Sequence, residues 1–219
     1  MNITYVEFVC TTIKKINIGI PIYTNQIAEH LGEAYQLDYK AAVAATAVAI
    51  KRILDGEIIP ELRMYQKGIY YRTTVTPFGE VGINREQLIA DKYLLPHNGY
   101  ETGLTVMHSM GLTTQMPRKR ILATNTAKEC TREDKKLEVT IRPPKITVTE
   151  ENKYYLQMLD VLEMMDKAPV DAEAPYEILA KQVYEKKLEF GILLAFANNF
   201  YNRNTILQLA NVASAGGMI

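Results

Sequence analysis

The sequence has little of what metal and redox chemistry requires. Its 219 residues include no tryptophan, two cysteines and three histidines. Cys10 and Cys130 lie far apart and have no CxxC spacing, which argues against a disulfide framework or a zinc site. His30, His97 and His108 form no HxxxH or HExxH pair. We therefore expect no metal and no cofactor, and the low cysteine content is typical of a cytoplasmic protein.

Long apolar runs are also missing. A membrane-spanning helix needs roughly 18 uninterrupted apolar residues. The longest candidate, from Phe190 to Phe200, is too short. The N-terminal stretch MNITYVEFVCTTIKK contains Glu7 and no extended apolar segment, unlike a signal peptide. These features predict a soluble, cytoplasmic protein without a membrane anchor.

An excess of charge of one sign is absent as well. Lys and Arg together number 25, and so do Asp and Glu. The distribution is less even, because residues 1–75 carry 8 basic and 7 acidic side chains, residues 76–150 carry 11 and 9, and residues 151–219 carry 6 and 9. This weakly favours nucleic-acid contact in the first two thirds of the chain.

The glycine-rich stretch GYETGLTVMHSMGLTTQMPRKR, which begins at Gly99, matches no phosphate-binding loop. It has neither GxGxxG nor a GK[ST] ending, and its Gly-x-x-x-Gly spacing lacks the apolar context of a membrane motif. His108 and Ser109 are adjacent, so they face different sides of a helix and form no catalytic pair. With no GxSxG motif elsewhere, the sequence predicts a protein that is not an enzyme.

The same stretch has a plain structural interpretation. We expect an entry turn at Gly99, a helix that begins near Glu101 or Thr102, and a left-handed C-cap at Gly111. In this interpretation Gly103 lets another backbone approach the helix closely.

The first 75 residues have the pattern of a winged helix-turn-helix domain. Apolar residues recur at helical spacing from Ile3 to Ile16, and two further helices are predicted at 24–32 and 38–56. Residues 57–75 then combine Pro60, a Lys-Gly turn and a β-prone Ile-Tyr-Tyr string, which favours a hairpin. Three helices followed by a hairpin place a recognition helix before a wing.

The proposed recognition helix is poor in side chains that read DNA bases. Its centre, AAVAATAVA, offers only Thr46 for hydrogen bonding, while Lys40, Lys51 and Arg52 stand at its ends. Val43, Ala47, Ile50 and Leu54 are expected to form its buried stripe. Two readings stay open: a DNA-binding domain, and a small helical unit that binds no DNA.

The rest of the chain, residues 76–219, divides in two. Residues 76–148 are predicted to be mixed α/β, with a short helix from Asn84 to Tyr93. The segments RKRILATN and KLEVTIRPP are expected to pair as an antiparallel ribbon across a charged loop. Residues 149–219 are predicted to be helical. The fold class expected for the whole chain is α+β, mainly helical.

Several separated motifs resemble one known family. A winged-helix start is followed in order by KGIYYR, by NGYETGLTVMHSMGLTTQMP and by RILATN. This order, which spans about residues 1–147, resembles the AbiEi-type antitoxins of type IV toxin–antitoxin systems. The resemblance implies a transcriptional autorepressor that binds inverted repeats in its own promoter. It also implies that the remainder counteracts a nucleotidyltransferase-like toxin, without a stable complex, in phage abortive infection.

The positions that would serve this function can be assigned. Thr46 would contact bases, and five cations at the helix ends and the wing would contact phosphates. These cations are Lys40, Lys51, Arg52, Lys67 and Arg72. The triplet Arg118, Lys119 and Arg120 is a possible second basic patch or a solvated strand entry. The alternative function is a winged-helix interaction module without DNA binding, whose acidic helical tail docks a partner.

Overall fold

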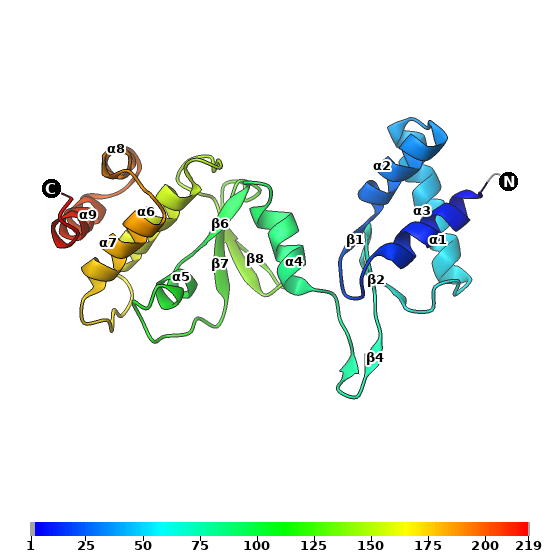
Figure 1. Ribbon diagram of the computed structural model, residues 1–219, viewed down its shortest axis with the longest axis horizontal. Helices are drawn as coiled ribbons and strands as arrows, with labels where there is room; N and C mark the ends of the chain where they lie inside the picture. The colour runs from blue at the N-terminus through cyan, green and yellow to red at the C-terminus, as the bar shows by residue number, and fades with distance from the viewer. Residues whose placement is uncertain (1–2, 219) are drawn as a thin grey trace. The chain divides into compact units, whose positions relative to one another are not determined.

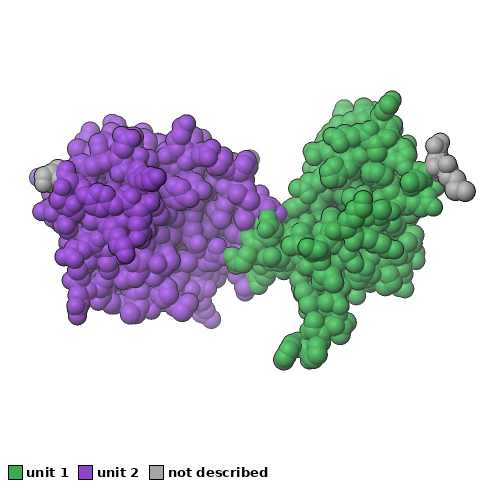
Figure 2. Space-filling view, viewed as in Figure 1, with its two compact units in different colours: residues 1–88 green, residues 89–219 purple. Residues whose placement is uncertain are grey.

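The computed structural model describes residues 3–218, and the chain forms two compact units. The N-terminal unit comprises residues 1–88 and the C-terminal unit residues 89–219 (Figure 2). The fold is α+β and mainly helical, as expected. The division falls after residue 88 and not after residue 75, because the intervening segment bonds to the first unit. Thr73 Oγ1 donates to the carbonyl of Val81 at 2.7 Å, and the Asn84 amide donates to the carbonyl of Gly19 at 2.7 Å.

Three helices and two hairpins build the N-terminal unit (Figure 1). Its elements in chain order are α1 (Tyr5–Lys15), β1 (Ile22–Tyr23), α2 (Thr24–Tyr35), α3 (Tyr39–Asp55), β2 (Leu62–Gln66), β3 (Ile69–Arg72), β4 (Val75–Thr76) and β5 (Gly79–Glu80). Strands β1, β3 and β2 form an antiparallel sheet in that order, and β4 pairs with β5. The hairpin expected between residues 57 and 75 is present as β2 and β3.

Side-chain caps define where α1 and α3 begin. Thr4 and Glu7 form a capping box at α1, and the Asp38 carboxylate accepts the Ala41 amide at 3.0 Å at α3. Gly32 does not end α2 as expected. The helix continues to Tyr35, and Gln36 takes the left-handed conformation that closes it, with φ of 56°. The apolar faces of the helices and the sheet enclose one core, formed by Val9, Ile13, Ile22, Ile27, Ala49, Ile50, Ile53, Ile59 and Leu62.

The C-terminal unit contains a four-stranded sheet. The elements from the end of the N-terminal unit onward are α4 (Arg85–Ile89), the π-helix η1 (Ala90–Leu94), β6 (Gly99–Thr102), α5 (Leu104–Ser109), β7 (Arg120–Thr124), β8 (Arg132–Asp134) and β9 (Val139–Arg142). The helix predicted from Asn84 is confirmed as α4 and η1, and Asn84 Oδ1 accepts the Gln87 amide at 3.0 Å.

The predicted antiparallel ribbon is wrong in its direction. The sheet order is β6-β7-β9-β8, and β7 and β9 are parallel, with Ile121 opposite Thr140. The charged loop between them contains β8, which pairs antiparallel with β9 and reverses the chain once more. An extra reversal between two strands is what makes them parallel.

The glycine-rich stretch differs from the expectation at its start. Residues 99–102 form strand β6 and not the first turn of a helix. The close approach of another backbone, which was expected at Gly103, occurs at Gly99. A Cβ at Gly99 would lie 2.5 Å from the carbonyl oxygens of Tyr93 and Ala123. Gly103 instead has a φ of 76° and faces the Ile121 side chain. The left-handed conformation expected of Gly111 is confirmed, with φ of 77°.

The described residues from 149 onward are mainly helical, as expected. They form α6 (Lys153–Met164), α7 (Pro175–Glu185), α8 (Phe190–Phe200) and α9 (Arg203–Ala215). Helix α6 packs between the sheet and helices α8 and α9, and α7 packs on α9 (Figure 1). Among residues 3–218, no helix is both long enough and apolar enough to cross a membrane.

Candidate functional site

One face of α3 is open to solvent. It carries Lys40 and Lys51 toward the two ends, with the small side chains of Ala44, Ala47 and Val48 between them. These positions are spaced by three and four residues along the helix, so they form one continuous stripe. The opposite face packs into the core through Ala42, Thr46, Ala49, Ile50 and Ile53. The expected stripe is wrong at Ala47, which is exposed, whereas Ile50 is buried and Leu54 packs against the core. Val43 is partly buried.

Thr46 does not occupy the expected position on the surface. Its side chain is 0% exposed, and its Oγ1 has no hydrogen-bond partner among the described residues. A buried side chain does not reach a base edge, so the assignment of Thr46 as a DNA contact is wrong. The alanine-rich sequence allows Thr46 to be buried, because a threonine fits between alanines on the packed face of a helix.

Four of the predicted cations lie on the surface. Lys40, Lys51 and Arg52 are exposed on α3, and Lys67 is exposed in the two-residue turn between β2 and β3. Gly68 completes this turn with a φ of 83°, and its carbonyl accepts the Thr24 amide at 3.0 Å. Lys67 therefore stands beside the start of α2. Within the described part of the chain, these four side chains form no ion pair.

The Arg72 side chain forms an ion pair and hydrogen bonds inside the N-terminal unit. Its Nη2 lies 3.0 Å from the Glu61 carboxylate, and its Nη1 donates at 2.9 Å to the carbonyls of both Lys14 and Ile16. These bonds tie β3 to the end of α1. Because the guanidinium already has these partners, Arg72 is a structural residue, and its assignment as a phosphate contact is wrong.

In the basic triplet at the start of β7, Lys119 and Arg120 form ion pairs with carboxylates. Lys119 lies 2.6 Å from the Glu133 carboxylate, and Arg120 Nε lies 2.7 Å from that of Glu101. Arg118 is exposed. Two of the three positive charges are thus balanced by carboxylates of β6 and β8, which corresponds to a solvated strand entry more than to an anion-binding patch.

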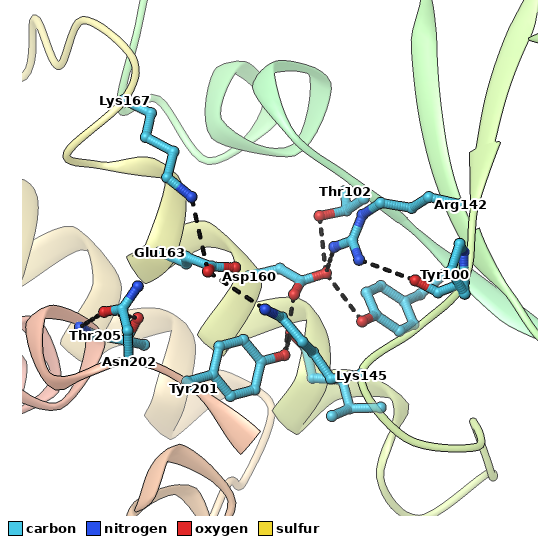
Figure 3. Close-up of polar contacts among 12 residues, drawn as sticks. Tyr100, Thr102, Arg142, Lys145, Asp160, Glu163, Lys167, Tyr201, Asn202 and Thr205 are labelled. Carbon is cyan, nitrogen blue, oxygen red and sulfur yellow. Dashed lines mark hydrogen bonds and ion pairs between the residues drawn. The ribbon is translucent and has the colours of Figure 1, made fainter. Parts of the chain in front are cut away.

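A polar network in the C-terminal unit has no counterpart in the sequence-based predictions. The Asp160 side chain, 1% exposed, accepts hydrogen bonds from Tyr100, Thr102 and Tyr201 at 2.9 to 3.0 Å and pairs with Arg142 (Figure 3). In the sequence, the one feature that could have indicated this network is an aspartate, Asp160, within the largely apolar run YLQMLDVLEMM. Burial, with the Asp160 charge next in importance, raises the pKa of both tyrosines, so they stay neutral donors.

The arrangement around Asp160 is structural. Both carboxylate oxygens are satisfied, and their donors come from β6, from β9 and from the turn between α8 and α9. A cavity of about 430 Å³ adjoins the network. Lys145 and Lys167 at its wall both pair with Glu163, at 3.3 and 3.7 Å. The three cations of the lining, Arg142, Lys145 and Lys167, face only two carboxylates, those of Asp160 and Glu163, so the wall of the cavity keeps a small excess of positive charge.

A second cluster joins η1 to β8. The Asp134 carboxylate lies 2.7 Å from both Lys92 Nζ and the Tyr93 hydroxyl. Burial alone would raise the pKa of Asp134, but the hydrogen bonds from Lys92 and Tyr93 outweigh it and hold the pKa at about 2. No group of His, Cys, Asp and Glu side chains within residues 3–218 is arranged to hold a metal ion.

The open face of α3 is therefore the candidate functional site. No model of a known protein family matches the chain, and no curated protein matches it.

Proposed function

We propose that the N-terminal unit is a winged helix that binds duplex DNA with α3 in the major groove. The proposal is carried by one observation, the open face of α3 with Lys40 and Lys51 near its ends. They are eleven positions apart in the sequence, which is about 16 Å along a helix. The major groove is about 12 Å wide, so long lysine side chains at these positions would reach the phosphates on its two sides.

The order of the elements supports the same proposal. A winged helix runs helix, short strand, helix, recognition helix and hairpin, as α1 to β3 do here. The first strand pairs with the last, so the sheet has the order β1-β3-β2. Lys67 in the hairpin turn would then be the cation of the wing.

Base recognition by this face would be apolar. Ala44, Ala47 and Val48 have no hydrogen-bonding side chain, and their methyl groups are suited to contact the C5-methyl group of thymine. The DNA sequences preferred would therefore be rich in A·T pairs. Shape and flexibility of the duplex would contribute the remaining selectivity.

The biological role we propose rests on the resemblance to AbiEi-type antitoxins. The DNA would be the chain's own promoter with its inverted repeats, and the chain would be a cytoplasmic repressor without enzymatic activity. The C-terminal unit would counteract a nucleotidyltransferase-like toxin. The alternative is an interaction module whose winged helix binds no DNA.

A titration of labelled upstream DNA at two salt concentrations tests DNA binding. Replacing Lys51 and Arg52 with Ala is expected to weaken binding to all sequences alike and to flatten the salt slope by roughly one unit per lost phosphate contact. Lys181→Ala, at an exposed lysine of α7, is the matched control and should change neither quantity. Failure of the wild-type chain to bind at low salt would favour the interaction module.

The antitoxin role needs a separate experiment. The chain is expected to restore growth when it is produced together with a nucleotidyltransferase-like protein encoded beside it. The variant with Lys51→Ala and Arg52→Ala should restore growth equally, because neutralisation is assigned to the C-terminal unit. Loss of rescue in this folded variant would show that DNA binding is required for neutralisation.

A further inference from the structure

The last part of the chain is almost free of charge. Between Phe190 and residue 219, Arg203 is the only charged side chain, although charged residues make up 23% of the whole sequence. Helices α8 and α9 form most of this segment, and they pack against each other (Figure 1). Surface helices usually carry charged side chains on the side that faces water.

The outward side of these two helices is uncharged apart from Arg203, and it combines apolar side chains with asparagines. Leu193 and Ala197 of α8 and Leu209 and Val212 of α9 are fully buried in the core. The opposite side presents Leu194, which is 42% exposed, and Leu207, which is 55% exposed. We define the α8–α9 face as the exposed residues Ile192, Leu194, Ala195, Asn198, Leu207 and Ala210.

We propose that the α8–α9 face is the contact between two copies of this chain, related by a twofold axis. Such an interface brings each patch against its own equivalent, so a charged patch would repel itself. This face carries no charge and avoids that repulsion. Depletion of charge together with exposed apolar side chains is also the composition of an interface core.

Other occupants fit the charges less well. The nine acidic side chains of residues 151–219 all lie at or before Glu189, outside the α8–α9 face. A partner with a basic surface would be attracted there and not to a neutral face. An anionic membrane surface would require Lys and Arg around the apolar side chains, and Arg203 is the one such residue in this segment.

The size of the face indicates a weak dimer. Helices of 11 and 13 residues are about 16 and 20 Å long, and packed neighbours lie about 8–10 Å apart. The footprint of the pair is smaller than the roughly 800 Å² per partner that a standard stable interface buries. We therefore expect the dimer to dissociate in the micromolar range, in the absence of DNA.

Sedimentation velocity of the full chain from low to high micromolar concentration tests the proposal. The wild-type chain should shift from monomer to dimer, and Ala195→Glu should remain monomeric because two carboxylates would be buried against each other. Ala34→Glu, an identical change at an exposed position of α2, is the matched control and should dimerise as the wild type does. Circular dichroism and thermal unfolding establish that both variants are folded.

Leu207→Glu provides a second test on the other helix of the face and should also abolish dimerisation. A wild-type chain that stays monomeric at high micromolar concentration would overturn the proposal. So would a folded Ala195→Glu variant that dimerises normally. The measurement uses no DNA, so its outcome is independent of whether the N-terminal unit binds DNA.

Discussion

The hydroxyl of Thr46 is buried in the N-terminal unit and has no partner among residues 3–218. A buried donor without a hydrogen bond costs about 1–3 kcal/mol. Thr46→Val keeps the shape and removes the hydroxyl, so the free energy of unfolding should rise by about 1 kcal/mol. Urea unfolding measures this change. Affinity for DNA should stay the same, and a weaker complex would mean that Thr46 does reach the duplex.

Val48 is 52% exposed in the middle of the open face of α3. If it contacts thymine methyl groups, DNA with uracil in place of thymine should bind less tightly. A buried methyl-sized group contributes about 0.8 kcal/mol, or about fourfold in affinity per contacted thymine. Val48→Ala should reduce this difference between the two DNAs. Equal binding of both DNAs by the wild-type chain would contradict apolar readout.

Single residues of the site could be predicted only in part. The exposed positions of Lys40 and Lys51 could be predicted, because charged side chains near the ends of a helix usually lie on the surface. The side of α3 on which Thr46 lies could not be predicted, because the surrounding alanines are compatible with both the packed and the open side of a helix. Arg72 was misassigned because its partners, Glu61 and the carbonyl of Lys14, are distant in the sequence.

At the scale of elements, the Asp160 network holds α6 against the sheet. Asp160→Ala leaves Arg142 partly buried without its carboxylate and removes the acceptor of three hydroxyl groups. Breaking one side of a buried pair costs about 3–5 kcal/mol. Chemical unfolding of the C-terminal unit should report this loss. Glu173→Ala, at an exposed position, is the control and should have little effect. A loss below about 1 kcal/mol would show that the network contributes little.

The contact between η1 and β8 is expected to depend on pH. The pKa of Asp134 is held at about 2, below its ordinary value of 3.8, so the folded state favours the ionised form. Its stabilisation is complete above the ordinary pKa and is lost as the pH falls toward 2. Asp134→Asn should therefore lower stability by about 1 kcal/mol at pH 7, because solvent screens the partly exposed Lys92.

The same variant should differ less from the wild type as the pH is lowered from 5 toward 2. Urea unfolding at a series of pH values measures the difference. A constant difference over this range would mean that the Asp134 charge does not contribute.

Helices were easier to predict than strand pairing. Periodicity and caps identify α1, α3 and α6 from local sequence, since each helix satisfies its own backbone. The direction of β7 and β9 depends on β8, a three-residue strand within a charged loop that has no apolar alternation. Pairing between strands that are not consecutive is set by the whole sheet, so local sequence did not predict it.

At the scale of the whole molecule, the two units have separate cores. A fragment of residues 1–88 should fold alone. It should bind DNA as tightly as the monomeric full chain does. A fragment of residues 89–219 should fold and bind no DNA. Circular dichroism and the DNA titration check both. If the full chain binds DNA and the folded first fragment does not, the DNA-binding surface must include residues of the C-terminal unit.

The residues of the Asp160 network are far apart in the sequence, and this has a consequence for synthesis on the ribosome. It joins Tyr100 of β6 to Tyr201, so the C-terminal unit is incomplete until nearly all of the chain has emerged. The N-terminal unit needs only residues 1–88. At about 5–20 residues per second, it would be available on the order of ten seconds earlier. Under the proposed function, prematurely terminated chains would therefore be able to bind the promoter while lacking the unit proposed to counteract the toxin.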